Sequence, residues 1–397
     1  MPRIYAKQVR DRLGSAILAA VTNTSDSIVI PDTLRPLDGR FASGPSKVRH
    51  EAVAALAEAA PTFLGTSHRK PAVKDIVGRL RTGVSDLFEL PEGWEVVLGN
   101  GGTTLFWDAA TFGLIDVRSQ HLSFGEFSSK FAKGVAGAPF LADPIVIESD
   151  TGTHPVAVAD ASVDFYALTH NETSTGVTMP LVRPQGANAD ALVAVDATSA
   201  AGAIAWDPAE VDCYYFAPQK AIASDGGLWI ACCSPAAIER ITSIAAGPRW
   251  IPAGLDLSIA LDNSVQNQTY NTPALATIYL AMHQIEWFNE NGGMSFSAGR
   301  SQELSSIVYD WATASPMASP FVTAAGQRSP VVATIDFDDA VSADEIAKVL
   351  RANGILDTEG YRKLGRNQLR IACFPAIEPS DMQALTASID FVIDALT

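Results

Sequence analysis

Lys220 stands in an unusual place for a strongly hydrated charge. It follows a short aromatic run, Cys213 to Phe216, and a second apolar run begins soon after it, Leu228 to Cys233. Both runs predict buried strands, so the lysine would sit on a tight turn between them. Two explanations stay open from this stretch alone. The side chain could face water, or it could be a desolvated amine held ready to form an imine.

Asp196 is the second residue of this kind. It comes directly after Leu192 to Val195, a run that predicts a buried strand, and it opens the sequence Asp196-Ala197-Thr198-Ser199. An aspartate in this position is often the N-cap of a helix. It can also be a buried carboxylate that pairs with the cationic nitrogen of a ligand.

A glycine-rich turn could bind phosphate. A predicted strand, Glu95 to Leu98, runs into Gly99-Asn100-Gly101-Gly102-Thr103-Thr104, and a helical pattern starts at Leu105. Glycines allow close approach of the backbone, free N–H groups point outward, and threonine hydroxyls can add hydrogen bonds. The turn is neither the G-x-G-x-x-G pattern nor a P-loop. A plain turn with a threonine N-cap is the alternative.

Three further positions carry polar or aromatic groups. Phe127 follows a predicted strand, Gln120 to Phe124, and is either core or a platform for a flat ligand. The strand Asp164 to Thr169 ends in a polar run, residues 170–176, which is a loop by default or a ligand contact at a strand end. His68-Arg69-Lys70 is either a solvated basic loop or an anion-binding one.

The elements that carry these residues predict how they meet. Strands alternate with helical segments, which favours an α/β domain with a mostly parallel sheet. Right-handed crossovers would then bring the strand ends to one edge of the sheet. The residues expected together there are Gly101 to Thr104, Phe127, Thr173, Asp196 and Lys220.

One ligand would need every member of this set. Pyridoxal 5′-phosphate requires an imine-forming lysine, a carboxylate for its ring nitrogen, an aromatic face and a phosphate cradle. Lys220 would hold the aldehyde, and Asp196 would keep the ring nitrogen protonated. Once released, Lys220 could move a proton as general base and acid. We predict no metal site.

Four short motifs together resemble the phosphoserine aminotransferase family, in class V of the fold-type I enzymes. They are Asn171-Glu172-Thr173, Asp196-Ala197-Thr198-Ser199, Gln219-Lys220 and Asn271-Thr272-Pro273, and the similarity runs from about Phe41 to the C-terminus. The resemblance implies a large domain with a mostly parallel central sheet and a smaller α+β C-terminal domain.

By this resemblance, Lys220 is the Schiff-base lysine and Asp196 the partner of the ring nitrogen. Thr173 would bond the ring hydroxyl, and Phe127 stands where the family usually stacks a tryptophan. The resemblance also implies phosphate contacts by Gly102, Thr103, Thr198 and Gln219, and by Asn271 and Thr272 from the other subunit of a homodimer. Thr103 departs from the family, which commonly has an arginine there.

The family's substrate contacts map onto four residues. His68-Arg69 matches a pair that meets the distal phosphate or carboxylate across the dimer interface, and Arg370 matches the arginine that binds the α-carboxylate. Arg362 is the candidate for a second distal arginine, although the segment lacks the family's histidine there. The implied reaction transfers an amino group from glutamate to 3-phosphohydroxypyruvate in serine biosynthesis. Some family members also serve vitamin B6 (pyridoxine) synthesis.

We predict three parts of the chain. Residues 1–40 form an N-terminal segment that packs with the small domain and contains an early helix, residues 41–290 form the large PLP-binding domain, and residues 291–397 form the small domain. A helix from Val48 to Ala60 should end at Pro61. Ser342 has the capping-box spacing that predicts the N-cap of a helix over residues 343–353.

Composition narrows the functional class. The net charge of -16 argues against non-specific nucleic-acid binding. The N-terminus lacks the apolar core of a signal peptide, and no apolar run reaches membrane-spanning length. Four cysteines lie in apolar runs, as expected of buried reduced thiols. We therefore expect a soluble cytoplasmic protein.

Three rival functions share parts of this pattern. A cysteine desulfurase needs a nucleophilic cysteine on a mobile loop, which the strand-like surroundings of the cysteines disfavour. An alanine- or serine-glyoxylate aminotransferase would not need the basic pair His68-Arg69. From another class, the chain could be a non-catalytic protein of the same fold, and the presence of both Lys220 and Asp196 argues against that.

Overall fold

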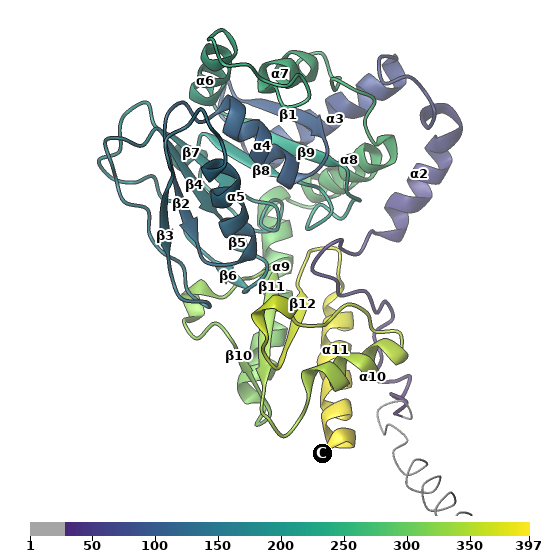
Figure 1. The fold of residues 1–397 in the computed structure, drawn as a ribbon. Helices are drawn as coiled ribbons and strands as arrows, with labels where there is room; N and C mark the ends of the chain where they lie inside the picture. Colours follow the sequence, from purple (N-terminus) through teal and green to yellow (C-terminus); the bar gives the residue numbers. More distant parts are fainter. Residues whose placement is uncertain (1–27) are drawn as a thin grey trace, which may run out of the picture.

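A seven-stranded sheet forms the centre of the larger part of the molecule (Figure 1). The structure is a computed structural model that describes residues 28–397. The strand order is β1-β9-β8-β7-β4-β2-β3. The strands are β1 (Glu95–Asn100), β2 (Ser119–Ser123), β3 (Ile145–Glu148), β4 (Phe165–Thr169), β7 (Leu192–Asp196), β8 (Cys213–Phe216) and β9 (Leu228–Cys233).

Only β9 runs against its neighbours in this sheet. It pairs antiparallel with both β1 and β8, while β2, β3, β4, β7 and β8 pair in parallel. The C-terminal ends of the other six strands therefore lie at one edge. The prediction of an α/β fold with a mostly parallel sheet is confirmed. A two-stranded hairpin, β5 (Asn171–Glu172) with β6 (Val177–Thr178), stands at that edge after β4.

Helices cover both faces of the sheet because its strands are apolar on both sides. On β8, Tyr214 and Phe216 belong to one core, and Cys213 and Tyr215 belong to the other. The first core includes side chains of α3 (Pro71–Leu87) and α8 (Leu275–Glu290). The second includes side chains of α4 (Thr103–Gly113), α5 (Glu126–Ala136), α6 (Pro235–Ala245) and α7 (Leu257–Ser264).

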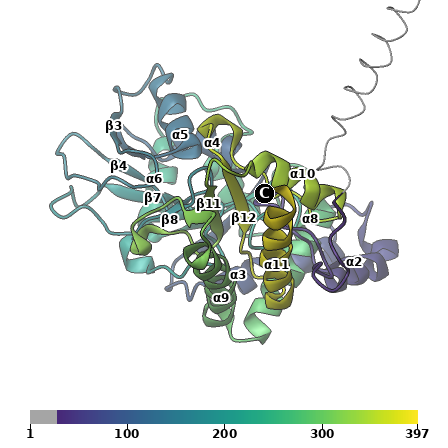
Figure 2. The same ribbon diagram turned by 90° about the horizontal axis from the view of Figure 1, so that it is seen from below.

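A second, smaller sheet lies beside the first (Figures 1 and 2). It contains β10 (Ala318–Pro320), β11 (Val332–Phe337) and β12 (Gln368–Ala372), packed with α9 (Gly293–Ala314), α10 (Ala343–Ala352) and α11 (Pro379–Leu396). Ile30 is buried in the same core, so this residue of the N-terminal segment contacts the small sheet's part of the molecule, as does Phe41, the first residue after the segment. The division of the chain near residue 291 stays a prediction.

Phe41 also joins the small sheet through its backbone. The Phe41 carbonyl accepts a hydrogen bond from the N–H of Ala372 on β12 (3.2 Å), and the Phe41 N–H donates to the Leu356 carbonyl (3.3 Å). The chain that leaves Phe41 contacts Lys220, in the turn after β8, through Ser43 and Ser46 before it enters α2 (His50–Phe63). This segment is therefore a physical link between the two sheets.

Some predicted boundaries were wrong. The α2 helix continues through Pro61 to Phe63, because a proline in the last turn deprives only the Ala57 carbonyl of a donor, and Ala57 is exposed to water. Ser342 is the N-cap of α10, as predicted, and its hydroxyl accepts from the N–H of Glu345 (3.3 Å). The early helix predicted before residue 28 lies outside the described residues.

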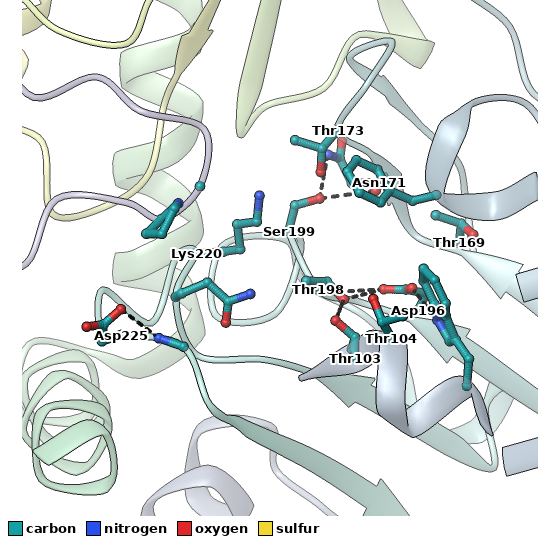
Figure 3. A pocket seen from close by; sticks show the side chains of 16 residues that line it. Thr103, Thr104, Thr169, Asn171, Thr173, Asp196, Thr198, Ser199, Lys220 and Asp225 are labelled. Atoms are coloured by element: carbon teal, nitrogen blue, oxygen red, sulfur yellow. Dashed lines mark hydrogen bonds between the residues drawn. The ribbon is translucent and has the colours of Figure 1, made fainter. Parts of the chain in front are cut away.

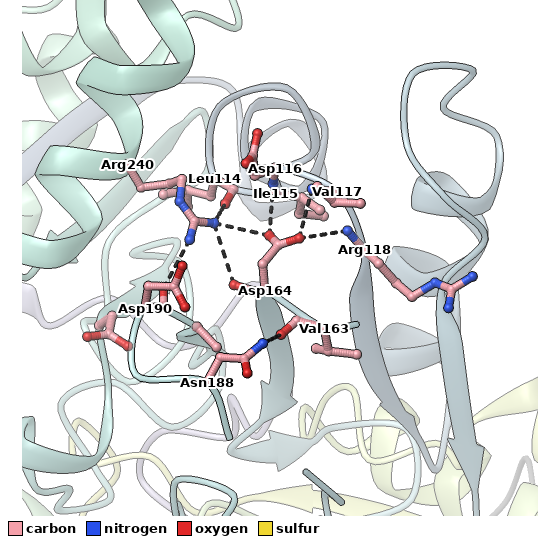
Figure 4. A network of polar contacts seen from close by, with 12 residues as sticks. Leu114, Ile115, Asp116, Val117, Arg118, Val163, Asp164, Asn188, Asp190 and Arg240 are labelled. Atoms are coloured by element: carbon pink, nitrogen blue, oxygen red, sulfur yellow. Dashed lines mark hydrogen bonds and ion pairs between the residues drawn. The ribbon is translucent and has the colours of Figure 1, made fainter. Parts of the chain in front are cut away.

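Asp164 fixes the start of β4 to two neighbouring segments (Figure 4). Its carboxylate accepts hydrogen bonds from the backbone N–H groups of Asp116, Val117 and Arg118, at 2.7–2.9 Å. Arg240 on α6 donates to the same carboxylate at 3.0 Å. Since a half-buried carboxylate is stabilised by such charge-assisted donors, this network sets the entry of β2 and β4 into the sheet. Within residues 28–397 we find no helix long and apolar enough to cross a membrane.

Candidate active site

A cavity of about 380 Å³ opens at the edge where the parallel strands end (Figure 3). It lies beside the ends of β4, β7 and β8 and the start of α4. Eight of the residues predicted from the sequence line it: Thr103, Thr104, Phe127, Thr173, Asp196, Thr198, Gln219 and Lys220. In Figure 3, Lys220 and Asp196 occupy opposite sides of this space.

Asp196 is a buried carboxylate held in place by hydrogen-bond donors. Its Oδ1 accepts from the backbone N–H (2.9 Å) and the hydroxyl (2.5 Å) of Thr198, and its Oδ2 accepts from the indole N–H of Trp107 (3.0 Å). Burial raises its pKa, and these donors partly offset that rise. Within residues 28–397 its hydrogen-bond donors are all neutral groups. A turn rather than a helix follows Asp196, so the N-cap alternative is wrong.

Lys220 is desolvated, so the alternative of a water-facing turn lysine is wrong. Its Nζ donates to the carbonyl oxygen of Ser43 at 2.5 Å. Burial lowers the pKa of this amine from 10.5 to about 8, and the positive charge of Arg370 contributes to that fall, against a smaller opposing effect of Asp196 and Glu172. An amine with this pKa is partly unprotonated near neutral pH and can act as a nucleophile.

Gly44 leaves the space that the Lys220 side chain occupies. A Cβ atom at residue 44 would lie 2.0 Å from Lys220 Nζ, and the φ angle there is +141°. The hydroxyl of Ser46 donates to the Lys220 carbonyl (2.5 Å), and the Ser46 N–H donates to the Gln219 carbonyl (2.9 Å). The segment from Ser43 to Ser46 thus holds both the amine and the backbone of the lysine turn.

The start of α4 offers hydrogen-bond donors to an anion. Gly102 is the N-cap, so the alternative of a threonine N-cap is wrong, and the first N–H groups of the helix have no intrahelical partner. Gly102 itself is not among the residues that line the cavity, but it adjoins Thr103, which is. The Thr103 hydroxyl lies 3.0 Å from that of Thr198. A helix N-terminus with two hydroxyls suits a phosphate group.

Phe127 is held by a carboxylate that the sequence did not single out. Glu172 is fully buried, and its Oε2 accepts from the N–H groups of Phe127 (3.1 Å) and Ser128 (2.9 Å) in the first turn of α5. Its Oε1 accepts from the N–H (3.1 Å) and hydroxyl (2.7 Å) of Ser174. An anion at a helix N-terminus is favourable, so Glu172 fixes the start of α5 and with it the half-buried Phe127.

The guanidinium of Arg370, on β12, has few hydrogen-bond partners among the described residues. One guanidinium nitrogen donates to the Thr173 carbonyl at 3.3 Å, and Nε has no partner among the described residues. Burial lowers the pKa of this guanidinium. Arg370 lines a second cavity of about 710 Å³, which Arg362 and Tyr361 also line and which adjoins the first at Gly44. A half-buried guanidinium with a nitrogen that lacks a partner among the described residues suits a carboxylate ligand.

Four predicted residues lie together outside the Lys220 cavity of the same chain. His68 Nδ1 is 3.1 Å from the hydroxyl of Thr272, and Arg69 is adjacent, with Nε 3.5 Å from His68 Nε2. Asn271 and Thr272 are exposed, and their carbonyls accept from the side-chain amide of Asn100. None of the four lines the Lys220 cavity.

Trp107 is a site residue that the sequence reasoning missed. It lies on α4, one turn after Thr103, lines the cavity and is 7% exposed. A tryptophan in an apolar helix is usually core, which is why the pattern gave no signal. The available clue was chemical: a buried indole N–H needs an acceptor, and Asp196 is one.

Comparison with known proteins gives concordant results. Residues 156–363 match the family model described as aminotransferase class-V. A phosphoserine aminotransferase of a Nocardioides species is 57% identical over 373 residues, which cover 94% of this chain and 100% of that protein.

Two solved structures share the fold. A phosphoserine aminotransferase from Cytophaga hutchinsonii superposes with a TM-score of 0.81 at 24% identity, covering 89% of this chain and 99% of the other. A PLP-bound phosphoserine aminotransferase from Trichomonas vaginalis gives 0.72 at 19% identity, covering 89% and 99%.

The pKa of Lys220 makes its reactivity predictable. In the cofactor-free protein, the rate of acylation of Lys220 by a small reagent should rise with pH and level off above about 8. Lys363 is the internal comparison, because its ion pair with Glu126 raises its pKa above 10.5, so its rate should still be rising there. Residue-resolved mass spectrometry measures both rates. A Lys220 profile that rises in parallel with that of Lys363 would contradict the desolvated amine.

Proposed function

The chain belongs to the phosphoserine aminotransferase family of class-V, PLP-dependent aminotransferases, and from that membership we propose how its own residues divide the work. The reaction exchanges an amino group between glutamate with 2-oxoglutarate and 3-phosphohydroxypyruvate with O-phosphoserine, in serine biosynthesis. The observation that carries the proposal is the placing of a desolvated Lys220 and an uncompensated buried Asp196 on opposite sides of one cavity.

The residues of the cavity fit pyridoxal 5′-phosphate. Among the described residues, Asp196 has only neutral donors and Gln219 Oε1 is buried without a partner. Lys220 offers an amine, and the start of α4 offers anion-binding N–H groups. When bound, this cofactor supplies an aromatic ring that accepts electrons from the substrate's α-carbon.

We assign the following residues to cofactor binding. Lys220 would bind its aldehyde carbon, Asp196 its ring nitrogen and Thr173 its ring hydroxyl, and Phe127 would pack against its ring. The phosphate would be held by Gly102, Thr103, Thr198 and Gln219, with Asn271 and Thr272 of the other subunit. Glu172 supports this arrangement indirectly, because it fixes the turn of α5 that carries Phe127.

Lys220 moves the proton of the reaction. An amine with a pKa of about 8 can accept a proton at Nζ and return it, which is what a general base and acid near neutral pH requires. Ser43 offers its carbonyl to that amine, so the side chain has an acceptor that keeps it in the cavity when it bonds nothing else. Asp196 holds its negative charge opposite, through the donors that surround it.

Arg370 binds the α-carboxylate of either substrate. Its Nε lacks a partner in the described part of the chain, so a carboxylate can satisfy it without breaking an existing ion pair. The distal phosphate or carboxylate meets Arg362 of the same chain and the His68-Arg69 pair of the other subunit. A glyoxylate-type aminotransferase would not need these basic residues, because its substrate has no distal anionic group.

A homodimer with shared sites is part of this proposal. His68, Arg69, Asn271 and Thr272 form one group, defined by the His68–Thr272 contact, that is separate from the Lys220 cavity of their own chain. They can contribute to a site only if a second copy brings them to it. The four cysteines, Cys213, Cys232, Cys233 and Cys373, are buried free thiols, in keeping with a cytoplasmic enzyme.

Two half-reactions test the proposed substrates. Glutamate should bleach the visible absorption band of the PLP-loaded enzyme, and 3-phosphohydroxypyruvate should restore it. Lys220→Ala should lower turnover by at least about a thousandfold, because it removes both the attachment point and the proton carrier. Stopped-flow absorbance measures each step. If glyoxylate restores the band as fast as 3-phosphohydroxypyruvate does, the substrate assignment fails.

Mixed dimers test the shared site. Arg69→Ala and Lys220→Ala should each be nearly inactive alone, since each removes a group from every site. In an equal mixture after subunit exchange, half of the dimers would pair the two variants and hold one intact site, so activity should recover to about a quarter of the wild-type value. Steady-state turnover before and after exchange measures the recovery.

A mixture of Arg370→Ala with Lys220→Ala is the matched control. Its expected result is no recovery, because Arg370 and Lys220 serve the same site from one chain, and a mixed dimer then has one defect in each of its two sites. Recovery in the Arg370 mixture together with none in the Arg69 mixture would contradict the proposal, because Arg370 and not Arg69 would then come from the other subunit.

A further inference from the structure

Trp107 lines the cavity and lies on α4, the helix whose N-terminus we propose as the phosphate-binding site. Its indole Nε1 donates to Asp196 Oδ2 at 3.0 Å, and both residues are buried. The indole lies nearly parallel to the ring of Phe131, with an angle of 14° between the planes and 6.0 Å between centroids. Because packing fixes the ring, the N–H cannot swing away from the carboxylate without disturbing the core.

The α4 helix meets Asp196 through two side chains that are four residues apart. Thr103 approaches it indirectly, through the Thr198 hydroxyl, which lies 3.0 Å from Thr103 and 2.5 Å from Asp196 Oδ1. Trp107 contacts Oδ2 directly. Residues at i and i+4 lie on the same helix face, about 5–6 Å apart. One carboxylate oxygen is therefore bonded directly to this face of α4, and the other is linked to it through Thr198.

We propose that Trp107 is a positioning residue for the reaction: its indole N–H orients and stabilises the Asp196 carboxylate that meets the cofactor's ring nitrogen. The inference rests on the proposed function. Because the N-terminus of α4 would also bind the cofactor's phosphate in the proposed function, the Trp107–Asp196 contact would link the two groups that hold opposite ends of the cofactor. Replacing the N–H leaves the phosphate cradle intact but releases the carboxylate at the other end.

The charge of Asp196 depends on such donors. Burial raises its pKa, nearby Glu172 raises it further, and the donors Thr198 and Trp107 lower it. Lys220 is the cationic group in the same cavity, and Asp196 raises the pKa of its amine.

Three more ionisable side chains lie around the carboxylate. Burial raises the pKa values of Tyr214 and Tyr215 well above 10, so both phenols stay neutral. Burial lowers the pKa of His170 to about 3, so its ring is also neutral. None of them can replace the Trp107 donor with a charge, and its loss must raise the pKa of Asp196.

The test compares cofactor affinity across pH. Trp107→Phe keeps an aromatic ring but removes the donor, so the dissociation constant for PLP at pH 8 should rise about tenfold to a hundredfold, as expected for a hydrogen bond to a charged group. The defect should grow as pH falls towards about 6, because the variant's carboxylate protonates at a higher pH than that of the wild type. Absorbance titration of the cofactor-free protein measures both quantities.

Trp206→Phe is the matched control. Trp206 also packs in a core, stacked on Tyr214 at 4.0 Å, but its indole N–H has no hydrogen-bond partner within residues 28–397. This variant should bind PLP as the wild type does at every pH. A second Trp107 variant carries benzothienylalanine, which has the shape of tryptophan without the N–H, so any loss of affinity cannot come from altered packing.

The thermal unfolding midpoint of each cofactor-free protein shows whether it folds. The proposal predicts a folded benzothienylalanine variant with a weakened, more pH-dependent affinity. Unchanged affinity at both ends of the pH range in that variant overturns it, as does a loss of affinity that is equal at both ends. If the wild type itself fails to bind PLP, the proposed function fails instead, and the two results are distinct.

Discussion

A buried carboxylate that has only neutral hydrogen-bond donors within residues 28–397 is the constraint on which the rest of this structure depends. Asp196 ends the central strand β7, where both faces of the sheet are covered by helices, and three hydrogen-bond donors keep it in place. Burying an unpaired charge is costly, and such a group persists in a fold when a ligand supplies the missing opposite charge. In the proposed function, a protonated ring nitrogen supplies that charge. The start of α4, the turn that carries Lys220 and the ring of Phe127 all lie at the same strand edge, around this carboxylate.

The two sheets contribute different halves of the site. The large sheet presents Asp196 and Lys220, while β12 of the small sheet presents Arg370, the proposed carboxylate ligand. The segment from Phe41 to Ser46 links them, since Phe41 bonds to β12 and Ser43 bonds to the Lys220 amine. Under the proposed function, this link would fix the distance between the arginine that binds the substrate carboxylate and the lysine that carries the proton. This explains why a residue as small as Gly44 is needed where the segment crosses Lys220.

Strand ends were the part of the site that sequence could predict. Asp196 and Lys220 each follow an apolar run, and parallel topology brings such positions together whatever the loops between them do. Side-chain contacts across long separations were not predictable in this way. The apolar pattern of its helix predicts that Trp107 is a core residue, and the polar run around Glu172 predicts only a loop. The contact of His68 with Thr272 joins residues that are 204 positions apart in the sequence. The reversed strand β9 and the continuation of α2 through Pro61 also depend on packing and solvation that a local pattern does not contain.

The increase in thermal unfolding midpoint that saturating PLP gives to the cofactor-free protein tests the central claim most directly, measured in the wild type and in Asp196→Asn. The wild type should be strongly stabilised, because the cofactor satisfies the buried charge and binds only the folded state. In Asp196→Asn the increase should largely disappear, although the phosphate cradle and Lys220 are unchanged. An equal increase in both proteins would contradict the account, because the carboxylate would then contribute nothing to holding the cofactor.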